Sequence, residues 1–100
     1  HVLDLENGQP AAGLTVALLS ADGSTLGEAA TDDDGRVSGF PELDAGTHTL
    51  RFEVDAWFTA QGRDCFYPTV TVAFKVDGGR AHYHVPLLLN RYGYSTYRGS

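Results

Sequence analysis

Two histidines at alternate positions, His82 and His84, are the residues in this sequence best suited to chemistry. A strand over residues 82–89 would put both imidazoles on one face, because successive side chains of a strand point to opposite sides. The other face would be apolar and carry Tyr83, Val85, Leu87 and Leu89. These neighbours predict that His84 is shielded from bulk water. Since an imidazole can accept a proton near neutral pH, His84 is a candidate general base.

The same pair offers two ligands to a metal ion, since both rings would point the same way. A zinc site needs three or four protein ligands, and only His1 and an acidic side chain remain to complete one. The acidic run at residues 32–34 is typical of a solvated turn, because the further oxygen ligands of a calcium loop are missing. The sequence therefore predicts neither a metal nor a cofactor.

Composition narrows the possible partners and compartments. A net charge of −6, with Lys75 as the single lysine, is unsuited to nucleic acid. No apolar run approaches the ~20 residues of a membrane helix, and residues 1–100 suffice for one compact domain. The lone Cys65 excludes an intrachain disulfide and is typical of a small buried hydrophobe. We expect a cytoplasmic protein, or a periplasmic one if a leader was removed before His1.

Alternating apolar runs separated by turn signals predict an all-β, antiparallel sandwich. Its strands are expected at residues 1–5, 14–19, 26–31, 36–40, 47–54, 67–76, 82–89 and 94–99. His48, in the fifth run, is expected to be exposed and without a role. Residues 55–62 could form one or two helical turns with Asp55 as N-cap. The last strand is poor in charge, so we expect it to pair edge to edge with another copy.

Several motifs resemble the 5-hydroxyisourate hydrolases, the transthyretin-related enzymes of urate breakdown. Residues 82–89 (HYHVPLLL) and 94–100 (YSTYRGS) resemble that family's C-terminal signature. Residues 1–5 (HVLDL) with 8–11 (GQPA) resemble its N-terminal motif, and Asp34-Gly35-Arg36 resembles its internal arginine motif. Phe66-Tyr67-Pro68 also fits the family. The resemblance runs from residue 1 to residue 100, and transthyretins proper lack the Tyr-Arg-Gly-Ser ending.

The resemblance implies a transthyretin-like sandwich of two four-stranded sheets with one short helix. It implies a homotetramer, a dimer of dimers whose channel holds the active sites, and hydrolysis of 5-hydroxyisourate without a cofactor. The catalytic residues it implies are His1, Arg36, His84 and Ser100. The substrate-binding residues it implies are His1, Arg36, Tyr97, Arg98 and Gly99.

One departure from the family pattern and two rival functions remain open. Asn90-Arg91 stands where the family is expected to have Ser-Pro, which adds a charge near the predicted dimer edge. One rival function is a transthyretin-like carrier that binds a small ligand without hydrolysing it. The other is a structural module of the prealbumin kind, which would need strands and turns but no C-terminal signature. A channel lined by histidines, an arginine and Tyr97 suits a purine-derived substrate better than an apolar hormone.

Overall fold

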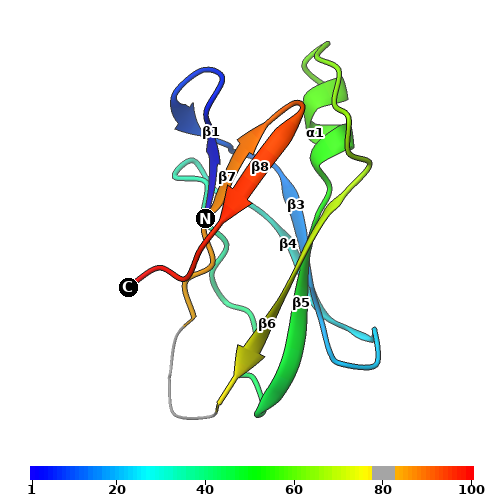
Figure 1. The fold of residues 1–100 in the computed structure, drawn as a ribbon, viewed down its shortest axis with the longest axis vertical. Helices are drawn as coiled ribbons and strands as arrows, with labels where there is room; N and C mark the ends of the chain where they lie inside the picture. The colour runs from blue at the N-terminus through cyan, green and yellow to red at the C-terminus, as the bar shows by residue number, and fades with distance from the viewer. Residues whose placement is uncertain (78–82) are drawn as a thin grey trace.

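The computed structural model describes residues 1–77 and 83–100, which form a two-layer β-sandwich (Figure 1). One four-stranded sheet has the order β2-β1-β7-β8, formed by Gln9–Pro10, Val2–Asp4, Leu87–Asn90 and Gly93–Thr96. The other has the order β4-β3-β5-β6, formed by Thr25–Ala30, Thr15–Leu19, Gly46–Phe52 and Val70–Val76. A helix, α1 (Val54–Thr59), lies at one end of the sandwich. The predicted all-β sandwich of two four-stranded sheets with one short helix is confirmed.

The core lies between the two sheets and follows the predicted alternation. In the antiparallel β3–β5 pair, Val16 lies opposite Phe52 and Leu18 opposite Leu50, so these side chains share one face. The facing sheet contributes the buried side chains of Val2, Leu87 and Leu89, and α1 contributes those of Val54 and Phe58. Cys65 is partly buried and packs against this core. Within the described residues, no helix is long and apolar enough to cross a membrane.

One strand pair is parallel, although the sequence predicts an antiparallel sandwich. β1 runs parallel to β7, with Val2 opposite Leu87 and Asp4 opposite Leu89. The Leu87 N–H donates a hydrogen bond to the His1 carbonyl at 2.8 Å, so the pairing extends to the residue before β1. In Figure 1 the N-terminus accordingly lies beside the β7–β8 hairpin. The two ends of the chain therefore meet on one sheet.

The prediction of a strand at residues 36–40 is wrong. The backbone groups around this segment bond to the turn before it and to β1. The Asp32 N–H donates to the Arg36 carbonyl at 2.9 Å, and the Val2 N–H donates to the Gly35 carbonyl at 2.7 Å. Val37 and Phe40 still pack against the core, which explains the apolar pattern that suggested a strand.

Two other strand boundaries in residues 1–77 differ from the prediction by two residues or more. β5 ends at Phe52 because the chain turns into α1 at Val54, and the N-cap is Glu53, without a side-chain hydrogen bond. Asp55 therefore lies inside the first helical turn instead of capping it. The run expected at residues 67–76 is a strand only from Val70 onward.

The C-terminal strands are shorter than predicted. β7 begins at Leu87, since Pro86 has no N–H to donate to a ladder. His84 thus precedes the strand, and His82 lies outside the described residues. The expected tight connection is present, because Asn90 pairs with Gly93 across a two-residue loop. β8 ends at Thr96, so residues 97–100 form a tail beyond it.

A charged network ties α1 and the β7–β8 loop to the end of β1. Arg63 donates to the buried carboxylate of Asp4 and to Glu6, each at 2.8 Å. Its guanidinium carbon lies 4.7 Å from the ring centroid of Phe58. Arg91 donates to the other Glu6 oxygen at 2.9 Å. Hydrogen bonds from Arg63 and then Arg91 lower the pKa of the Glu6 carboxyl, so this acid stays charged in the network.

Candidate functional site

His1 and His84 form a stacked pair of imidazoles. Their ring centroids lie 5.8 Å apart, with an angle of 26° between the ring planes. The parallel β1–β7 pairing explains this contact. His1 comes directly before β1 and His84 shortly before β7, and parallel strands bring the residues before them to the same edge of the sheet.

The buried Nε2 atom of His84 has no hydrogen-bond partner among the described residues. A buried polar atom without a partner is uncommon, because its desolvation is not offset. Such atoms occur in catalytic sites, where the partner is a reactant. His84 Nε2 is therefore the atom of this site best suited to receive a proton.

Arg36 reaches the histidine pair from the turn before residue 37. The Asp32 carboxylate fixes this turn by accepting the Arg36 N–H at 3.0 Å. Gly35 lies against β1, has a φ of +74°, and has so little space that a Cβ atom there would collide with the Val2 carbonyl oxygen. Arg36 lines the same cavity as His1 and His84. No acidic side chain in residues 1–77 or 83–100 forms an ion pair with Arg36.

A cavity of about 470 Å³ joins these groups, within the size range of small-molecule sites. Its polar lining residues are His1, Thr31, Arg36, Ser38, Tyr83, His84 and Ser100. Apolar residues of the sheet interior, among them Leu50 and Phe74, line the rest together with Gly99. The four residues implied to be catalytic therefore line one cavity.

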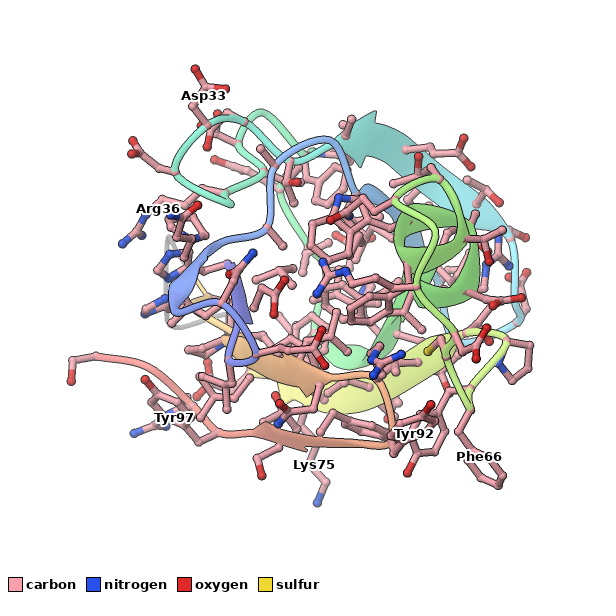
Figure 2. The ribbon with its side chains drawn as sticks, turned by 90° about the horizontal axis from the view of Figure 1, so that it is seen from above. Asp33, Arg36, Phe66, Lys75, Tyr92 and Tyr97 are labelled. Atoms are coloured by element: carbon pink, nitrogen blue, oxygen red, sulfur yellow. The ribbon has the colours of Figure 1, made fainter. Side chains whose placement is uncertain are left out.

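Tyr97 and Arg98 lie apart from this cavity. They line a neighbouring cavity of about 250 Å³, which shares Phe74, Tyr83, His84 and Val85 with the first. Figure 2 shows the Tyr97 and Arg36 side chains toward the same side of the molecule. The structure therefore places the implied substrate-binding residues around two adjoining spaces on either side of His84.

Among the lining residues that were not predicted from the sequence are Tyr83 and Ser38. Tyr83 was assigned to the core face, but it lines both cavities, and its hydroxyl donates to the Asp77 carboxylate at 3.0 Å. Ser38 was placed in a strand that does not form. The alternation that placed these residues fails because residues 36–40 and 83–86 are not strands.

The prediction that His48 is exposed is wrong. It is 6% exposed, and its Nδ1 atom has no hydrogen-bond partner within the described parts of the chain. It is buried because it shares the inner face of β5 with Leu50 and Phe52, next to the Phe74 ring. It does not line the cavity of His84. Where the structure describes the chain, no three His, Cys, Asp or Glu side chains gather as metal ligands.

A transthyretin-like sandwich with a cavity lined by two histidines is the class that this fold and site define. Residues 1–99 match the HIUase/Transthyretin family, and the chain belongs to it.

Individual relatives are similar in sequence over the whole chain. A probable 5-hydroxyisourate hydrolase of Caenorhabditis elegans is 42% identical over 106 residues, spanning 100% of this chain and 78% of the relative. The 5-hydroxyisourate hydrolase of Mesorhizobium japonicum is 43% identical over 110 residues, which span 100% of this chain and 89% of the relative.

Solved structures of this family have the same fold. The structure of Klebsiella pneumoniae 5-hydroxyisourate hydrolase superimposes with a TM-score of 0.90 at 40% identity, covering 100% of this chain and 89% of that one. Sea bream transthyretin in complex with thyroxine gives a TM-score of 0.89 at 26% identity, covering 98% of this chain and 90% of that one.

The close approach of Gly35 to β1 predicts an unequal effect of two glycine substitutions. Gly8 has the same φ of +74° but no atom within 4 Å of an added Cβ, so Gly8→Ala adds only backbone strain, about 1 kcal/mol. Gly35→Ala also adds overlap with Val2, and we expect a further loss of about 1–3 kcal/mol in unfolding free energy. Urea denaturation of both variants measures the difference. Equal destabilisation would contradict the contact.

Proposed function

We propose that this protein hydrolyses 5-hydroxyisourate to 2-oxo-4-hydroxy-4-carboxy-5-ureidoimidazoline, a step of urate breakdown. The observation that carries the proposal is the His1–His84 pair, which lines a cavity with Arg36 and Ser100. The relatives named as 5-hydroxyisourate hydrolases, at 42–43% identity over the whole chain, support the same substrate.

The reaction opens a cyclic amide with water. His84 accepts a proton from the water through Nε2, and the water oxygen bonds to the ring carbonyl carbon. As the carbon–nitrogen bond breaks, protonated His84 returns its proton to the leaving nitrogen, and the new carboxylic acid loses its remaining proton to solvent. The stacked His1 ring lies close enough to His84 to share in these transfers. No covalent intermediate and no cofactor are needed.

Arg36 stabilises the oxyanion that forms on the carbonyl. Its guanidinium is permanently charged, presents a fork of donors and has no acidic partner within the described residues. Ser100 binds the substrate in the same cavity. Tyr97 and Arg98 contribute hydrogen bonds from the adjoining cavity. The polar lining and the unpartnered Nε2 atom favour hydrolysis over the role of a carrier.

We further propose that residues 1–100 form one hydrolase domain that assembles as a homotetramer, a dimer of dimers. β8 is the last strand of its sheet. The exposed aromatic side chains of Phe66, Tyr92 and Tyr94 lie on or near this strand. The Tyr67 ring packs edge to face against Phe66 and Tyr94, with ring centroids 5.2 Å apart in each pair. Figure 2 shows Phe66 and Tyr92 together at one side of the molecule. A second copy pairing along β8 would cover these rings.

The Asn90-Arg91 connection is compatible with this assembly. Arg91 is paired with Glu6 inside the same chain, so its charge does not have to be desolvated alone at a subunit contact. We propose a cytoplasmic protein whose partners are its substrate and its own copies, without nucleic acid or membrane.

The decay of freshly generated 5-hydroxyisourate, followed by its ultraviolet absorbance, tests the activity. We expect the protein to accelerate this decay and His84→Ala to lower kcat by about 10²–10⁴-fold, the usual contribution of a general base. His48→Gln changes a histidine outside the cavity and should keep the rate. A wild-type rate equal to spontaneous decay would refute the hydrolase proposal, and full activity of His84→Ala would refute the role of His84.

The proposed contact along β8 can be tested with two substitutions of equal exposure. Tyr94 on β8 and Leu26 on β4 are each 41% exposed. We expect Tyr94→Lys to reduce the particle mass from that of four chains, because it places a charge in the apolar contact. Leu26→Lys should leave the mass unchanged. Light scattering after gel filtration measures both, and an intact tetramer in Tyr94→Lys would exclude this contact.

A further inference from the structure

Gly99 makes an unusually close contact with His84. It is buried, although its neighbours Arg98 and Ser100 are exposed. A Cβ atom on Gly99 would lie 2.7 Å from Cε1 of the His84 ring, 2.5 Å from Cγ and closer still to Nδ1. The φ of Gly99 is not in the left-handed region, so the backbone does not require glycine there. What requires glycine is the space taken by the imidazole.

The backbone of the tail is held against residues 84–86 by its own hydrogen bonds. The Gly99 N–H donates to the His84 carbonyl at 2.8 Å. The Thr96 hydroxyl donates to the Pro86 carbonyl at 2.7 Å. These bonds continue the β7–β8 pairing past Leu87, where the regular ladder stops. The position of Gly99 is therefore fixed independently of the ring it touches.

The contact involves one side of the imidazole. Nδ1, Cγ and Cε1 are the ring atoms nearest Gly99, and Nε2, the other nitrogen, is the buried atom without a partner. The His1 ring stacks on the same imidazole. His84 thus has little freedom to turn about its side-chain bonds, because a rotated ring would collide with the tail or lose the stack.

We propose that Gly99 is a positioning residue for the hydrolase reaction. Its missing side chain lets the tail backbone close on the Nδ1 side of His84, which leaves Nε2 as the nitrogen that exchanges the proton. The inference rests on the proposed function and changes the role implied for Gly99, from binding the substrate to holding the base.

Gly99→Ala tests this role, with Gly93→Ala as the matched control. Gly93 lies on β8, has an ordinary φ and has no atom within 4 Å of an added Cβ. We expect Gly99→Ala to lower kcat about 10–100-fold, because displacing a catalytic group by ~1 Å has effects of this size. KM should stay within about threefold, since the substrate contacts remain. The ¹⁵N signals of the His84 ring should shift in Gly99→Ala and stay unchanged in Gly93→Ala.

A double-mutant cycle gives a readout that needs no activity. Gly99→Ala should lower Tm in the wild-type background but not in His84→Ala, where the vacated ring space accepts the methyl group. Equal losses in both backgrounds, unchanged His84 signals, or a raised KM at constant kcat would each overturn the proposal. If the wild-type protein does not hydrolyse 5-hydroxyisourate, the proposed function fails, and the ring signals and the Tm cycle still decide whether Gly99 positions His84.

Discussion

The parallel pairing of β1 with β7 is the constraint on which the site depends. Strands at opposite ends of the sequence become neighbours, so the residues before them share one edge of the sheet. His1 and His84 stack for this reason. Ion pairs hold the opposite end of the same strands. Arg63 pairs with Asp4 at the end of β1 and with Glu6, and Glu6 also pairs with Arg91 in the β7–β8 loop. The register that aligns the two imidazoles is thereby supported at both ends.

Two glycines bring the remaining groups to the histidine pair. Gly35 lets the turn that carries Arg36 approach the backbone of β1, and Gly99 lets the tail approach the His84 ring. Both positions exclude a side chain for steric reasons. The motifs Asp-Gly-Arg and Tyr-Arg-Gly-Ser therefore each combine a chemically useful residue with the glycine that allows its segment to reach the site.

The fold could be predicted from the sequence because alternation and turn residues report local structure. The core residues Leu87 and Leu89 and the connection from Asn90 to Gly93 follow from these rules. Residues 36–40 and 83–86 could not be assigned correctly, because their hydrogen bonds and contacts are tertiary. His48 shares the alternation of Leu50 and Phe52 on β5, so its burial could have been predicted from the same rule. The grouping of His1, Arg36, His84 and Ser100 came from a family resemblance, since their sequence separation contains no distance information.

We propose that His84 Nε2 and Arg36 act together on a purine-derived ring in the cavity they share. A crystal structure of the protein with a stable purine analogue tests it most directly. We expect the analogue to lie between the two side chains, with a ring carbonyl oxygen bonded to the Arg36 guanidinium and Nε2 facing the carbonyl carbon. An analogue bound away from His84, or with Arg36 turned out of the cavity, would contradict it.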